Sequence, residues 1–111
     1  MENLSIGQVV LASFPFSDLS SQKLRPCLVI GMAEFNDIVL CQITSNRYGS
    51  RRAVPLKHND FSRGTIITDS FIRPDKIATS GRDTVKRVLG SVTKDKLDEV
   101  KQKLKVILEI M

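Results

Sequence analysis

The sequence has few of the residues that usually carry specialised chemistry. It contains no Trp, one Tyr, one His and two Cys, and aromatic side chains make up 5% of the chain. Any hydrophobic core must therefore be mainly aliphatic. Cys27 and Cys41 each lie inside an apolar run, and the chain has no CxxC pair or Cys/His cluster. We expect both thiols to be buried, reduced and inert, and we expect no structural zinc, other metal site or cofactor.

Long hydrophobic runs are also absent. No apolar run approaches the length that spans a bilayer. The first residues, Met1–Asn3, lack the basic-then-apolar pattern of a signal peptide. We expect a soluble, cytoplasmic protein that does not bind membranes.

The totals favour one folded domain with a basic surface. A chain of 111 residues with 41% hydrophobic content is long enough for one domain, residues 1–111, with a modest core. Lys and Arg number 17 against 12 Asp and Glu, which gives a formal charge of +5. This excess favours a polyanionic partner such as nucleic acid, although many basic domains bind none.

A strand pair organises the chain. Leu24–Gly31 and Asp37–Ser45 are short apolar runs rich in Val, Ile and Leu, which is typical of buried strands. The short link between them predicts an antiparallel hairpin. In a hairpin the start of the first strand lies beside the end of the second, so Arg25 is expected near Thr44 and Ser45.

These three side chains form a candidate phosphate site. Pro26 suits the first position of a strand because it lacks an N–H, and it restrains the backbone directly after Arg25. A permanent cation beside the hydroxyls of Thr44 and Ser45 can bind phosphate oxygens. The simpler alternative is an exposed arginine and a Thr-Ser turn that ends a strand.

Two polar loops flank the hairpin. Pro15–Leu24 is rich in Ser and leads into Arg25, so it is either a lid over that arginine or a plain connection. Asn46–Arg52 carries three arginines and the single tyrosine. Flexible cations with one aromatic ring suit single-stranded nucleic acid, and a solvated basic loop is the alternative.

The remaining chain predicts more strands and then one helix. Ala53–Lys57 reads as an edge strand because Pro55 would interrupt a central ladder. Thr65–Ile72 is strongly β-forming, Ser62–Gly64 reads as a turn, and Thr84–Val92 is a strand or a helical turn. From Thr93, a suitable N-cap, apolar residues recur at spacings of three and four, which predicts an amphipathic helix. We expect the helix lysines to form a solvated face: Lys94, Lys96, Lys101, Lys103 and Lys105.

This order of elements predicts a mainly β (α+β) fold. Gly7–Phe14 supplies a first strand, and neither a linker nor an internal repeat divides the chain. A strongly bent sheet of this size, with a C-terminal helix over one opening, forms a small β-barrel.

The combined pattern resembles the PemK/MazF family of type II toxin–antitoxin toxins. Each matching segment is weakly specific alone, and their order and spacing make the resemblance fairly specific over nearly the whole chain. The segments are Gly7–Val10, Phe14–Pro15, Arg25–Ile30, Ile43–Ser45, Ser70–Ile77 and Leu89–Val92.

The resemblance implies a compact barrel related to SH3-like barrels and to the CcdB toxins, assembled as a homodimer. It implies a metal-independent endoribonuclease, an mRNA interferase that cuts single-stranded RNA by attack of a 2′-hydroxyl and leaves a cyclic phosphate and a free 5′-hydroxyl. It also implies a cognate antitoxin whose acidic, partly disordered tail blocks the site. DNA would be bound only through that antitoxin.

The resemblance also implies roles for particular residues. Arg25 corresponds to the family's central arginine, and Thr44, with Ser45 as a substitute, orients a phosphate oxygen. Some members carry an acid or a histidine in the loop before the arginine, where this chain offers Asp18. Others place an acid/base pair on a later strand, where this chain has Thr68 and either Asp69 or Ser70. Candidates for RNA binding are the nearby cations and the tyrosine: Lys23, Arg47, Tyr48, Arg51, Arg52 and Arg73.

Two other functions are compatible with the same fold. The first is a catalytically impaired module that binds nucleic acid or protein, because Leu19 and Ser20 cannot act as a base. The second is a gyrase-binding toxin like CcdB, although the chain ends Glu109–Met111 without the aromatic terminus of that family. Fold resemblance alone does not decide between them.

Overall fold

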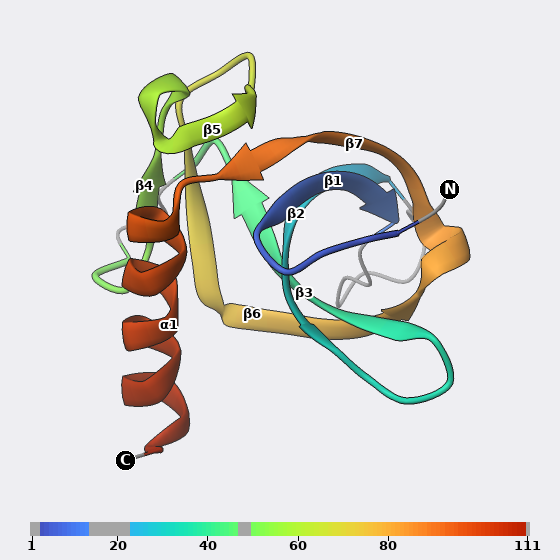
Figure 1. Ribbon diagram of the computed structural model, residues 1–111. Helices are drawn as coiled ribbons and strands as arrows, with labels where there is room; N and C mark the ends of the chain where they lie inside the picture. Colours follow the sequence, from blue (N-terminus) through green and yellow to red (C-terminus); the bar gives the residue numbers. More distant parts are fainter. Residues whose placement is uncertain (1–2, 14–22, 47–49, 111) are drawn as a thin grey trace.

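The computed structural model describes residues 3–13, 23–46 and 50–110. It is a curled antiparallel sheet with a C-terminal helix (Figure 1). The strands lie in the order β4-β6-β3-β2-β1-β7-β5. Their bounds are β1 Gln8–Ser13, β2 Leu24–Met32, β3 Asp37–Thr44, β4 Val54–Leu56, β5 Phe61–Gly64, β6 Ser70–Gly81 and β7 Val85–Val92. Two 3-10 turns, η1 His58–Asp60 and η2 Arg82–Thr84, precede β5 and β7, and helix α1 spans Lys94–Leu108.

The predicted hairpin is confirmed as β2 and β3. These strands are antiparallel, with Cys27 opposite Gln42 and Leu28 opposite Cys41. The middle of each strand is buried on both faces, Cys27–Val29 in β2 and Leu40–Ile43 in β3, which explains the apolar runs there. Side chains at alternate positions point to opposite faces and pack in two separate cores. Cys27 lies in one core and Cys41 in the other.

The two cores occupy the two sides of the curled sheet. One core contains Val10, Val29 and Leu40, and the other places Leu28 and Ile43 in the cluster that also holds helix residue Val100. In Figure 1, α1 runs beside β6 and β4 and covers that part of the sheet. The predicted small barrel with a C-terminal helix is therefore confirmed as a half-barrel curl.

The helix begins where the sequence predicts. The Thr93 side chain accepts a hydrogen bond from the Lys96 backbone N–H (3.2 Å), which satisfies one free amide of the first turn. The expectation of a fully solvated lysine face is wrong for Lys96, which is 9% exposed. Its Nζ donates to the carbonyl of Pro55 (2.8 Å) and to Glu99 (3.0 Å), so it joins the helix to β4.

The secondary structure predicted between β4 and β6 is wrong. Residues 65–69 form no strand, and the predicted turn at residues 62–64 is strand β5, which pairs with β7. Gly64 has φ 70° and lies opposite Gly90, and a Cβ on either would overlap the other strand's backbone. This close approach ends β5 and sends residues 65–69 across the sheet as an irregular segment.

Strand β6 contains a bulge. Cys41 is paired with Ile77 and the next residue of β3, Gln42, with Arg73, so Pro74, Asp75 and Lys76 have no partner on β3. Pro74 is fully buried, and a bulge tolerates proline because no ladder N–H is needed there. In a regular strand, positions 73 and 76 would face opposite sides; the bulge removes that constraint.

Candidate functional site

One cavity of about 730 Å³ opens beside the ends of β2 and β3. Its walls come from β1, β2, β3, β6 and β7 and from the irregular segment 65–68. Its polar lining consists of basic, hydroxyl and amide side chains: Arg25, Arg73, Lys76, Arg87, Thr44, Ser45, Thr65, Thr68, Ser70 and Gln42. Its apolar lining is Leu11, Pro26, Ile43, Ile66, Ile67 and Leu89.

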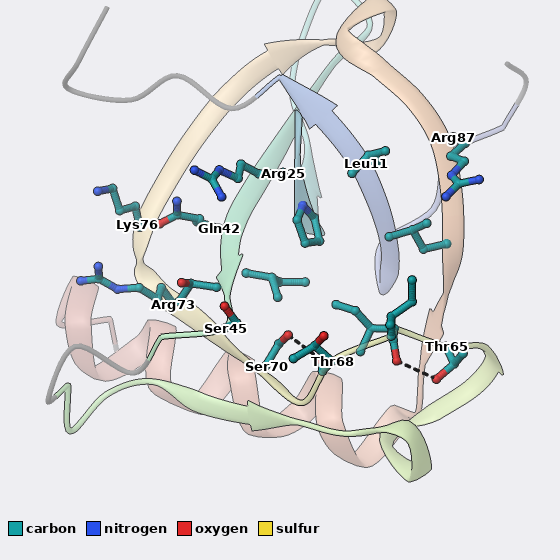
Figure 2. A pocket seen from close by; sticks show the side chains of 16 residues that line it. Leu11, Arg25, Gln42, Ser45, Thr65, Thr68, Ser70, Arg73, Lys76 and Arg87 are labelled. Atoms are coloured by element: carbon teal, nitrogen blue, oxygen red, sulfur yellow. Dashed lines mark hydrogen bonds between the residues drawn. The ribbon is translucent and has the colours of Figure 1, made fainter. Parts of the chain in front are cut away.

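The cavity brings together the residues of the predicted phosphate site. Arg25, Thr44 and Ser45 all line it, as the hairpin register requires. Figure 2 shows Arg25 on the same side of the cavity as Gln42, Lys76 and Arg73. The exposed Arg25 lies on β2 opposite Ala12 of β1, so its backbone is held by the sheet.

Arg73 and Lys76 reach the cavity together because of the bulge in β6. Arg73 forms an ion pair with Asp75 (3.1 Å), while Asp75 itself is not among the lining residues. Gln42, the partner of Arg73 on β3, is a polar residue only 8% exposed. Buried polar side chains are uncommon unless they have a partner or a function, so Gln42 is a further candidate residue of the site.

The charged side chains that line the cavity are all positive. Its described lining contains four cationic side chains, Arg25, Arg73, Lys76 and Arg87, and no carboxylate. Cations gathered in a concave site focus a positive potential, which attracts polyanions. The hydroxyls beside them are neutral groups that hydrogen-bond to phosphate oxygens.

The other predicted site residues are placed differently. Ser70 lines the cavity, is 5% exposed and donates to the Thr68 carbonyl (2.7 Å), whereas Asp69 is exposed and does not line it. Lys23, Arg51 and Arg52 are exposed outside the cavity lining. Asp18, Arg47 and Tyr48 lie outside the described residues, as do residues 15–22 of the predicted lid and the centre of the basic loop.

Four polar lining residues were not predicted: Gln42, Thr65, Lys76 and Arg87. Lys76 depends on the bulge, and Arg87 depends on irregular pairing of β7 with β1, where Leu11 is opposite Arg87 and Ala12 is opposite Val85. The Pro next to Arg73 was a usable signal for the bulge. No comparable signal in the sequence marks Arg87.

Metal ligands do not gather in the described part of the chain, where no three His, Cys, Asp or Glu side chains form a group that could hold an ion. Both cysteines are free and buried. Among residues 3–13, 23–46 and 50–110, no helix has the length and apolarity needed to cross a membrane.

The fold recurs in solved toxin structures. An endoribonuclease in complex with its cognate antitoxin, from Mycobacterial species, has a TM-score of 0.75 and 22% identity, over 100% of this chain and 98% of that one. A MazE-MazF structure from Deinococcus radiodurans has a TM-score of 0.76 and 21% identity, over 97% and 98%. Mycobacterium tuberculosis toxin MazF-mt6 has a TM-score of 0.73 and 15% identity, over 94% and 98%. At these identities the likeness shows the fold.

Sequence comparison gives the family. No curated protein sequence matches the chain significantly. A family model described as PemK-like, MazF-like toxin of type II toxin-antitoxin system matches residues 5–108. The match includes the hairpin that carries Arg25, Thr44 and Ser45, and it extends through α1. The chain therefore belongs to the PemK-like, MazF-like toxins of type II toxin–antitoxin systems.

Proposed function

We propose that this protein is a toxin that cleaves single-stranded RNA within the cavity beside β2 and β3. The observation that carries the proposal is the lining of that cavity, with four cations and a row of hydroxyls but no carboxylate. Such a surface suits a phosphodiester whose charge increases during reaction. The family match over residues 5–108 supports the same activity and a single toxin domain over residues 1–111.

The proposed reaction is an internal transesterification. The substrate 2′-hydroxyl loses its proton and forms a bond to the adjacent phosphorus, while the bond from phosphorus to the 5′-oxygen breaks. That oxygen gains a proton, leaving a cyclic 2′,3′-phosphate and a 5′-hydroxyl. Arg25 stabilises the doubly charged phosphorane through paired N–H donors, and Thr44 or Ser45 orients a phosphate oxygen. A guanidinium stays protonated in proteins, so we assign Arg25 an electrostatic role.

The cavity needs no metal ion in this proposal, because its cations can supply the charge stabilisation that a metal would otherwise provide. We expect purified protein to cut a mixed single-stranded RNA pool in EDTA. The ends should be cyclic phosphates and 5′-hydroxyls, identified by end-specific ligation and sequencing. Protein that binds RNA but cuts no sequence would instead support the binding-module alternative.

We also propose a homodimer built on the groove between the C-terminal half of α1 and the sheet. Ile77, Leu104, Leu108 and Ile110 line a mainly apolar groove of about 410 Å³ together with Ile30 and Val39. Lys101 and Lys105 of α1 also line it. Leu108 and Ile110 are 52% and 57% exposed, and Val106 nearby on α1 is 65% exposed. Apolar side chains gathered at this density mark an interaction surface, and a second copy offers an equally apolar surface.

If the groove is the dimer interface, a single charge placed in it should disrupt the dimer. Leu108→Asp should convert the dimer to a monomer at micromolar concentration, because it places a carboxylate in an apolar interface. Sedimentation velocity would measure this. Val88→Asp is the matched control, since Val88 is 39% exposed but lies outside the groove. Equal mass for wild type and Leu108→Asp would place the interface elsewhere.

The proposed partner in the cell is a cognate antitoxin with an acidic tail. Two of the similar structures are an endoribonuclease in complex with its cognate antitoxin and a MazE-MazF structure. In this chain the cationic cavity is the surface that an acidic segment would neutralise, in competition with RNA. DNA would then be bound through the antitoxin and not through this cavity.

A further inference from the structure

The cavity is divided chemically into two sides. In Figure 2, Arg25, Arg73 and Lys76 lie on one side, and Leu11, Thr65 and Arg87 lie on the other. The apolar residues Leu11 and Leu89 belong to the same cavity, on β1 and β7. Cations therefore lie on both sides of the cavity, and apolar side chains of β1 and β7 line it as well. Separate cations combined with apolar side chains suit a single strand, in which charged phosphates alternate with unpaired bases.

The irregular segment Thr65–Thr68 contributes the most unusual part of this surface. Ile67 lines the cavity and is 100% exposed, whereas its neighbour Ile66 packs against the core beneath the helix. One isoleucine thus anchors the segment while the next is presented to solvent. A single exposed isoleucine needs no explanation by itself, but this one is part of a cavity wall.

The ends of the segment are tied down by side chains. The Thr65 hydroxyl lies 2.8 Å from His58 Nδ1 and donates to the Ile66 carbonyl (3.3 Å). At the other end, Ser70 Oγ donates to the Thr68 carbonyl (2.7 Å). These contacts hold the wall at both ends without a strand ladder.

The middle of the segment has two backbone N–H groups that bond to no other described residue. Among the hydrogen bonds of residues 3–13, 23–46 and 50–110, none uses the backbone N–H of Ile66 or Ile67. Backbone amides in a fixed segment can read the acceptor pattern on the edge of an unpaired base. A base in a duplex has no free Watson–Crick edge for such contacts, which restricts the reading to single strands.

We propose that Thr65–Thr68 is the base-reading wall of this toxin, with Ile67 packing on the face of the base and the segment's amides contacting its edge. The base lies between phosphates bound by the Arg25 side and by Arg87. This inference rests on the proposed RNA substrate. The uncharged wall would set which base is preferred, and the cations would bind the phosphates of any RNA sequence. His58 and Ser70 are positioning residues for that wall.

The test uses RNA hexamers with 2′-fluoro groups, which lack the attacking hydroxyl and report binding without cleavage. Wild type should prefer certain bases at one position. Ile67→Ala should weaken binding to the preferred hexamers about 5- to 10-fold, by loss of apolar contact, and leave other hexamers nearly unchanged. Arg87→Ala should weaken all hexamers, and its slope of log affinity against log salt should shrink by about 0.7. Phe35→Ala is the control, because Phe35 is 91% exposed and outside the cavity.

Each outcome is decisive. Base-independent binding by wild type overturns the inference, as does an Ile67→Ala variant that binds like wild type or loses affinity equally for every hexamer. If base-dependent binding is found but unmodified RNA is never cut, the nuclease proposal fails while the base-reading wall stands. Because the Ile67 side chain is fully exposed, the variant should fold normally, and its melting temperature checks this.

Discussion

Replacement of Arg25 by alanine is expected to slow RNA cleavage about 10²- to 10³-fold, the usual effect of removing one donor that stabilises a developing anion. Arg25 lines the cavity beside Thr44 and Ser45, and the sheet holds its backbone through pairing with Ala12. Its contribution should appear mainly in kcat, because the charge on the phosphorane exceeds that on the ground-state phosphodiester. Single-turnover cleavage of one RNA containing the mapped site would measure it.

Two further variants separate this effect from general charge. Arg25→Lys keeps a cation but loses the planar pair of donors, so it should remain well below wild type. Lys86→Ala removes a cation from an exposed position of β7 outside the cavity and should cut RNA at nearly the wild-type rate. Unchanged cleavage in Arg25→Ala, or equal losses in Arg25→Ala and Lys86→Ala, would remove Arg25 from the reaction centre.

The sequence predicted the parts of the fold that depend on local pattern. The hairpin of β2 and β3 follows from two apolar runs and a short link, and its register alone brings Arg25 toward Thr44. The start of α1 follows from the periodicity after Thr93 and from its capping side chain. These features are local or involve neighbouring strands, so few long-range contacts are needed to specify them.

The sequence did not predict features set by distant pairing. Residues 65–69 have strong β propensity, yet the close approach of Gly64 to Gly90 directs them away from a ladder. Their isoleucines serve the cavity wall and the core beneath the helix instead. Strand propensity measures how well a side chain suits a pleated, half-buried surface, and here tertiary context overrides it.

The cationic lining shows the same limit. Lys76 joins Arg73 only because three residues of β6 bulge away from β3, and Arg87 reaches the cavity through irregular pairing of β7 with β1. Pro74 is a sequence signal for the bulge in β6, whereas nothing in the sequence marks the irregular pairing of β7. Half of the four-cation arrangement was therefore visible only in the structure. Arg25 was a candidate from the hairpin register, and Arg73 was a candidate from the family resemblance.

The fold is also expected to lose stability at alkaline pH because of its two thiols. Burial, with a smaller effect of Cys41, raises the pKa of Cys27 from 9.0 to about 12. Burial, with a smaller effect of Asp75, raises the pKa of Cys41 from 9.0 to about 12. Both thiols should therefore be protonated and unreactive in the native protein at neutral pH, as expected for buried cysteines.

The sign of the effect follows from proton binding. Above about pH 9 the unfolded chain releases both thiol protons, whereas the folded protein keeps them until about pH 12. The folded state then binds more protons, so the free energy of unfolding falls as pH rises. The stabilisation is fully present below pH 9, and each thiol can remove up to about 1.4 kcal/mol per pH unit above it. Against a typical stability of about 5–15 kcal/mol, this loss is large.

Urea unfolding at pH 8, 9, 10 and 11 would measure this loss in the wild type and in the Cys27→Ala/Cys41→Ala double variant. Lysines and other alkaline groups titrate in both proteins, so the difference in slope isolates the thiols. We expect the wild type to lose stability more steeply above pH 9, even where the variant starts less stable because each missing sulfur leaves a small void. Parallel curves from pH 8 to pH 11 would show that the thiols release their protons without unfolding, which two sulfurs buried in opposite cores of this sheet should prevent.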